Sequence, residues 1–162
     1  MLALSLAVPN IYSVESDQAW LEGIKSAKDH AQNPYRGSHI CKWVDIGKTG
    51  DWGYPTDTKE HENYWKYPSA PWLSDQKADN PDTILIDGRF RTACFLFSMM
   101  YAKPGTTILF DDYIDRTHYH SVENYALPVK TVDRMAIFIV PERQDLSEHH
   151  VKLVLKSLQD VR

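Results

Sequence analysis

A strand–helix–strand unit at Thr83–Asp111 restricts the fold of this 162-residue chain more than any other stretch. The aliphatic run TILI ends in Asp87 and Gly88, and the similar run TTILF ends in Asp111 and Asp112. The segment between the runs is apolar nearly all round, which predicts a buried helix. Two strands joined by such a helix pair in parallel, with a right-handed crossover. The unit therefore predicts an α/β fold.

The rest of the chain alternates in the same way. Trp20, Leu21, Ile24 and Ala27 share one face of a predicted helix that begins at Ser16 or Asp17. We predict strands at 10–16, 39–46, 83–87, 106–111, 129–132 and 135–140, and helices at 17–33, 90–101, 118–126 and 146–161. The opening MLALSLAV is interpreted as the end of a helix. Together these elements predict a single domain over 1–162, with a mainly parallel sheet, flanking helices and an antiparallel last strand.

Residues 47–82 are rich in Gly, Pro, Trp, Tyr and Asp. We expect an ordered loop with short helical pieces, because disordered segments rarely carry so many aromatic residues. A long ordered loop is usually functional. Its rings either cover a ligand or only pack the loop onto the sheet.

Charge and cysteine content limit the partners that we expect. The formal net charge is -4, and no basic run stands out, so a nucleic-acid partner is not expected. The apolar N-terminal run is too short for a membrane span. The two cysteines form no metal-binding spacing and are interpreted as free thiols. These features favour a cytoplasmic protein that does not bind membranes.

Acidic residues close three of the predicted strands: Glu15, Asp87, and the pair Asp111 and Asp112. Ligands of open parallel sheets bind at the carboxyl ends of the strands. Each acid also has a structural explanation. Glu15 could be a solvated strand end or a helix cap, and Asp87 could belong to an Asp-Gly turn. The Asp111 and Asp112 carboxylates could be neutralised by arginines, the candidates being Arg89, Arg91 and Arg116.

Two other motifs are weaker. GKTG at 47–50 lacks the upstream glycine of a phosphate loop. His118 and His120 form an HxH pair, which we interpret as histidines at the surface or beside a substrate rather than as a zinc site.

The ordered series VESD (14–17), ILIDGRFR (84–91) and ILFDDY (108–113) resembles the class I S-adenosylmethionine-dependent methyltransferases. It is most similar to the small bacterial-type group with IDG and DDY strand ends. The resemblance implies a Rossmann-like fold and S-adenosylmethionine as the cofactor. It also implies methyl transfer to a hydroxyl of a small molecule or glycan.

The resemblance also implies residue roles. Glu15 matches the acid that binds the ribose hydroxyls, and Ser16 and Asp45 are assigned to the same cofactor. Asp87 matches the acid beside the methyl donor and acceptor, which makes it a cofactor-binding residue and the first candidate base, with His118 as the second. Related catechol-type enzymes bind a divalent metal at these strand ends. A Mg²⁺ site at Asp87, Asp111 and Asp112 is therefore expected, although Asp112 replaces the usual amide.

One departure from the family pattern affects these expectations. The family opens with a strand and a Gly-rich loop, and no GxGxG or GxGxS occurs in this sequence. The missing strand would lie between the strand ending at Glu15 and the strand ending at Asp87. Either the chain is a fragment, or a second copy or another partner donates the strand, or the strands have closed up and cofactor binding is lost. The alternative functions are a non-catalytic binding module and a metal-dependent enzyme of another class.

Overall fold

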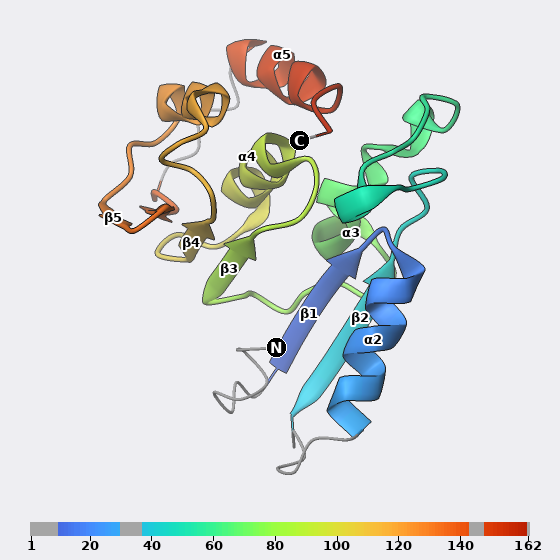
Figure 1. Ribbon diagram of the computed structural model, residues 1–162. Coiled ribbons are helices and arrows are strands. Elements are labelled where there is room, and N and C mark those ends of the chain that lie inside the picture. Colours follow the sequence, from blue (N-terminus) through green and yellow to red (C-terminus); the bar gives the residue numbers. More distant parts are fainter. Residues whose placement is uncertain (1–9, 30–36, 143–147, 162) are drawn as a thin grey trace. The chain divides into compact units, whose positions relative to one another are not determined.

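The computed structural model describes residues 10–29, 37–142 and 148–161 (Figure 1). The chain divides into two compact units, residues 1–71 and 72–162, and each has its own sheet. The predicted helical N-terminus, and the predicted end of the following helix at Asn33 and Pro34, lie outside the described residues. The prediction of one domain over the whole chain stays a prediction.

The N-terminal unit contains a parallel strand pair. Strand β1 (Asn10–Glu15) pairs with β2 (Ser38–Trp43), and helix α2 (Gln18–Asp29) follows β1 (Figure 1). Helix α2 begins where the sequence predicts, because Asp17 Oδ1 accepts hydrogen bonds from the N–H groups of Ala19 and Trp20 at 2.8 and 3.2 Å.

Two details of this unit differ from the prediction. Strand β2 ends before the predicted Ile46, because Asp45 Oδ1 accepts the Gly47 N–H at 2.9 Å and turns the chain. The prediction that Trp20 and Leu21 share one buried face of α2 is also wrong. Leu21 is buried, but Trp20 is 60% exposed, because neighbouring helical residues point about 100° apart.

The loop after β2 is ordered and holds short helical pieces, as predicted. They are η1 (Asp51–Gly53), η2 (His61–Asn63) and α3 (Lys66–Leu73). Within the N-terminal unit, Tyr67 Oη donates to Val14 O at 3.4 Å, and Tyr12 Oη donates to Ala70 O at 3.2 Å. These tyrosines pack the loop against β1, whereas the Trp52 ring is exposed.

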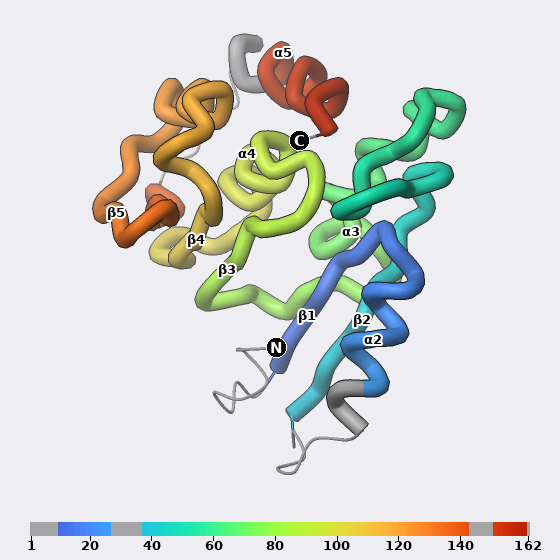
Figure 2. Tube along the Cα trace, in the orientation of Figure 1, coloured from blue at the N-terminus to red at the C-terminus, as the bar shows by residue number. Residues whose placement is uncertain are grey.

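The C-terminal unit contains a four-stranded sheet in the order β3-β4-β6-β5. Figure 2 traces the chain through this unit and labels β3, β4 and β5. Strands β3 (Thr83–Ile86) and β4 (Thr107–Phe110) are parallel, and the crossover between them contains helix α4 (Arg91–Tyr101). Strand β6 (Met135–Ile139) is antiparallel to β4 and to β5 (Lys130–Val132). The remaining elements are the 3-10 helix η3 (Thr117–Asn124) and helix α5 (Glu148–Ser157). The parallel unit and the antiparallel last strand are both confirmed.

Aromatic rings form the core of the C-terminal unit. Phe95 from α4 meets Phe110 of β4 and Phe138 of β6, at ring-centroid distances of 6.0 and 4.8 Å. All three side chains are fully buried. This cluster positions the ends of β3 and β4 by fixing α4 on the sheet.

The hydrogen-bonded pairing divides into a two-stranded and a four-stranded sheet, and β1 is not paired with β3. The sequence predicts a missing strand between these two strands. The missing strand stays a prediction. In the part of the chain that the structure describes, no helix combines the length and the apolar character needed to cross a membrane.

Neither Cys41 nor Cys94 forms a disulfide bond, and we expect the Cys94 thiol to be unreactive in the folded protein. Burial in α4 raises the pKa of the Cys94 thiol to about 12. We expect iodoacetamide to leave Cys94 unmodified in the native protein at pH 8, because only about one thiol in 10⁴ is then a thiolate. Mass spectrometry after labelling, with and without urea, measures this. Equal labelling of Cys94 in both conditions would contradict the prediction.

Candidate functional site

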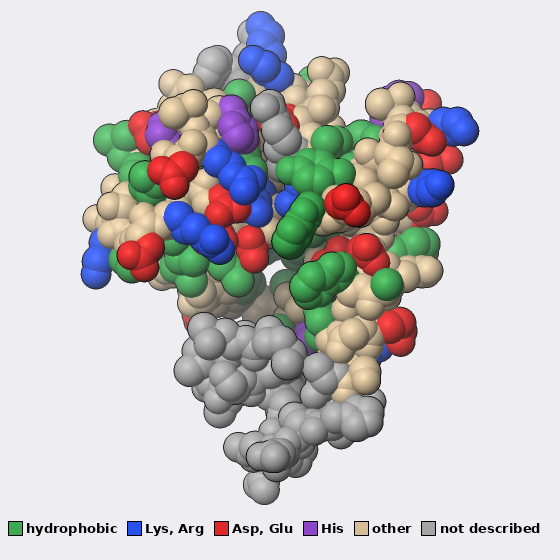
Figure 3. Space-filling view, viewed as in Figure 1, with side chains coloured by type: hydrophobic (Ala, Val, Ile, Leu, Met, Phe, Trp, Pro, Cys, Tyr) green, Lys and Arg blue, Asp and Glu red, His purple; other side chains and the backbone are tan. Residues whose placement is uncertain are grey.

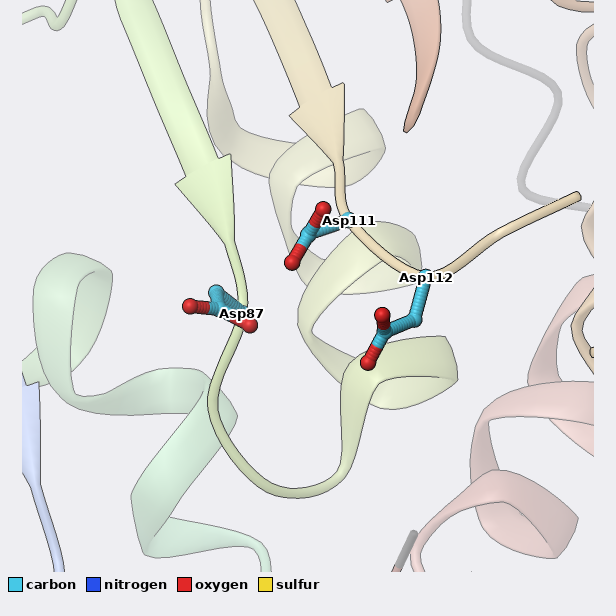
Figure 4. Close-up of side chains that lie close together, drawn as sticks. All are labelled: Asp87, Asp111 and Asp112. Atoms are coloured by element: carbon cyan, nitrogen blue, oxygen red, sulfur yellow. The ribbon is translucent and has the colours of Figure 1, made fainter. Parts of the chain in front are cut away.

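Three acids meet at the carboxyl ends of β3 and β4, as the sequence predicts. Asp87 follows β3, Asp111 and Asp112 follow β4, and their side chains lie around the space between the two strand ends (Figure 4). One carboxylate oxygen of each lies within 4.8 Å of the others. The parallel pairing of Ile86 with Phe110 causes this, because it brings the residues after both strands together.

Arginines neutralise these carboxylates. Arg91 Nη2 lies 3.2 Å from Asp87 Oδ1, and Arg91 Nη1 lies 3.2 Å from Asp112 Oδ2. Arg116 Nη2 lies 2.7 Å from Asp112 Oδ2, so the pairing predicted for Arg91 and Arg116 is confirmed. On the visible face of the C-terminal unit, acidic and basic side chains lie next to one another (Figure 3).

Arg134 is a partner that the sequence analysis missed. Its Nε and Nη2 donate to the two oxygens of Asp111 at 3.0 and 2.8 Å, and its Nε lies 3.2 Å from Asp112 Oδ1. The register of β4 and β6 pairs Phe110 with Ala136, so residues just before β6 lie beside the end of β4. The antiparallel strand order is the only sequence signal that could have pointed to Arg134.

The pKa values of two neighbouring acids are shifted in opposite directions. Partial burial raises the pKa of Asp87, and the nearby Asp111 and Asp112 raise it further against the opposing effect of Arg91. Burial acts in the same direction on Asp111, but hydrogen bonds from Arg134 and from the Asp112 backbone overcome it and lower the pKa of Asp111. As the pH falls, Asp87 is therefore protonated before Asp111.

The three carboxylates are suitable ligands for Mg²⁺, but their pairing with arginines is not suited to binding it. Three carboxylates are the oxygen ligands that this ion prefers. However, both oxygens of Asp111 already accept hydrogen bonds from Arg134, and both Asp112 oxygens lie within ion-pair distance of arginines. The residues as arranged do not fit a divalent cation. The metal-ligand role of the three acids stays a prediction.

Two non-glycine residues at these strand ends adopt left-handed backbone conformations. Phe90 has φ 54° and Asp112 has φ 53°. Aspartate tolerates this conformation, but for a bulky residue such as phenylalanine it is a real outlier. Strained residues of this kind gather at functional sites, which marks these strand ends as the candidate site of the C-terminal unit.

The predicted cofactor residues of the N-terminal unit gather at the ends of β1 and β2. Glu15 Oε1 accepts hydrogen bonds from the N–H groups of Ser16 and Asp17 at 2.7 and 3.0 Å. These bonds fix the carboxylate and leave Oε2 to accept others. The Ser16 hydroxyl is buried and has no hydrogen-bond partner among the described residues. Asp45 is exposed and lies just beyond the end of β2. Because β2 pairs with β1, the last residue of β2, Trp43, lies opposite Glu15.

His118 lies at the start of η3. Its ring packs against that of Tyr119 at a centroid distance of 4.1 Å, and its Nε2 is shielded from solvent. His120 stacks on Tyr113 instead, with Nε2 3.2 Å from Tyr113 O. The two rings thus have different environments, which does not suit a shared zinc ion.

Comparison with known proteins gives one informative match. A crystal structure of a methyltransferase-like protein from Silicibacter pomeroyi DSS-3 is similar to this chain, with a TM-score of 0.83 and 33% sequence identity. The similarity covers 93% of this chain and 77% of that one. No protein-family model and no curated protein matches the sequence.

Proposed function

Because the chain belongs to the family of the methyltransferase-like protein from Silicibacter pomeroyi DSS-3, we propose that it is an S-adenosylmethionine-dependent methyltransferase. The acceptor that we propose is a hydroxyl of a small molecule or glycan. The C-terminal unit has the α/β architecture of such enzymes, with a parallel strand pair and an antiparallel last strand.

The observation that carries the proposal is the state of Glu15 and Ser16. A ribose presents two hydroxyl donors, and Glu15 Oε2 is an acceptor on a carboxylate that backbone N–H groups already orient. A buried hydroxyl without a partner costs about 1–3 kcal/mol, so the Ser16 side chain favours a polar ligand beside it. Asp45 supplies a further acceptor for the same ligand.

S-adenosylmethionine, when bound, would supply an electrophilic sulfonium methyl group, whose carbon an acceptor oxygen attacks in line while the C–S bond breaks and the thioether leaves. Glu15, Ser16 and Asp45 would bind and orient the cofactor, and positioning is most of what such a reaction requires. The acceptor hydroxyl must also lose its proton. Asp87 is the first candidate base, because its raised pKa strengthens it relative to Asp111, and His118 is the second. No step passes through a metal ion.

Calorimetric titration of the purified chain with S-adenosylmethionine, and separately with its demethylated product, tests the proposal. We expect micromolar binding of both compounds without added Mg²⁺. The circular dichroism spectrum of the same sample verifies that the chain is folded. A folded chain that binds neither compound would contradict the enzymatic proposal and favour a non-catalytic binding module.

A further inference from the structure

The acids at the ends of β3 and β4 form a charge-balanced group with three arginines. Asp87, Asp111 and Asp112 contribute three negative charges, and their ion-pair partners contribute three positive charges: Arg91, Arg116 and Arg134. We call Arg91 and Arg134, which both bond to Asp111, the arginine clamp.

Arg91 links the two strand ends through their main chains. Its side chain is only 4% exposed. Nη2 and Nε donate to the carbonyl oxygens of Asp87 and Gly88 at 3.0 Å each, and Nη1 donates to Asp111 O at 2.8 Å. The guanidinium also lies over the Tyr119 ring, with Cζ 5.9 Å from its centroid. A planar five-donor group can satisfy acceptors on both strand ends at once.

Arg134 forms hydrogen bonds with both carboxylate oxygens that Asp111 could offer to a cation. It binds both oxygens of Asp111, the most buried of the three acids. In contrast to Arg91, its own side chain is 63% exposed, so it can be replaced without opening the core.

We propose that the arginine clamp holds the carboxyl ends of β3 and β4 together and excludes divalent cations from the three acids. In this arrangement Arg91 cross-links the ends of β3 and β4, and Arg134 prevents the Asp111 carboxylate from binding a metal ion. Removing Arg134 should therefore convert the three acids into a divalent-cation site.

Electron paramagnetic resonance of Mn²⁺ measures this directly, since bound Mn²⁺ loses its free-ion signal. The proteins are the wild type, Arg134→Gln, the matched control Arg116→Gln, and the double variant Arg134→Gln/Asp111→Asn. Arg116→Gln also removes a cation from Asp112 but leaves the bidentate pair on Asp111 intact. Circular dichroism verifies that each variant is folded.

We expect Arg134→Gln to bind Mn²⁺ at least about tenfold more tightly than the wild type, in the range of about 10⁻⁴–10⁻³ M typical of weak carboxylate sites. Arg116→Gln should resemble the wild type, and the double variant should lose the gained binding. Wild-type binding as tight as that of Arg134→Gln, or no gain in Arg134→Gln, would overturn the proposal. Neither result depends on cofactor binding, so this inference and the proposed function fail separately.

Discussion

Replacing Arg91 with methionine should lower the free energy of unfolding of the C-terminal unit by about 3–5 kcal/mol. Methionine keeps much of the length of the side chain but donates no hydrogen bonds. The Asp87, Gly88 and Asp111 carbonyl oxygens would lose their donor, and the cluster would keep unbalanced negative charge in a partly buried place. Urea denaturation followed by circular dichroism measures the loss.

Arg116→Met is the matched control for this measurement. Arg116 also pairs with Asp112, at 2.7 Å, but its side chain is 38% exposed. Exposed ion pairs contribute about 0–1 kcal/mol, so this variant should change stability little. Equal destabilisation by both substitutions would show that the cluster depends on net charge alone and not on the bonds of Arg91 to the main chain.

The second large effect concerns Glu15. We expect Glu15→Ala to weaken the binding of S-adenosylmethionine about tenfold or more, because a hydrogen bond to a charged group contributes about 1.5–3 kcal/mol. Calorimetric titration of the variant and the wild type under identical conditions measures the difference.

Glu22→Ala serves as its control. Glu22 lies on the exposed side of α2, where it pairs with Lys25 at 2.8 Å, and it should leave affinity unchanged. Because Glu15 also accepts the Ser16 and Asp17 N–H groups, the thermal stability of Glu15→Ala must be compared with that of the wild type. Unchanged affinity in a folded Glu15→Ala protein would remove the ribose assignment.

Periodicity predicted the elements of the C-terminal unit well, because local pattern and burial agree there. The segment before Tyr101 is apolar nearly all round and forms the buried helix α4, and the aliphatic runs on either side form the paired strands β3 and β4. The meeting of Asp87 with Asp111 followed directly from parallel pairing.

The parts that the sequence did not predict depend on long-range register. Arg134 reaches Asp111 only because β6 returns antiparallel beside β4, a pairing that the spacing of the two residues does not encode. The left-handed backbone of Phe90 likewise has no local signal, since glycine or asparagine is the usual residue for it. Trp20 was misplaced because it points about 100° away from Leu21 on the helix, and Leu21 is the residue that is buried.

The position of β3 in its sheet has a consequence for solubility. In the described part of the chain β3 pairs only with β4, and its residues TILI carry no charge and no proline, with Leu85 60% exposed. Uncharged edge strands of this kind can add strand to strand between molecules and aggregate. Here Asp82 and Asp87 flank the strand on both sides, which is how gatekeeper charges limit such growth. A neutral substitution at Asp87 therefore removes a gatekeeper as well as a candidate base, and the soluble fraction must be known before its lost activity is assigned to chemistry.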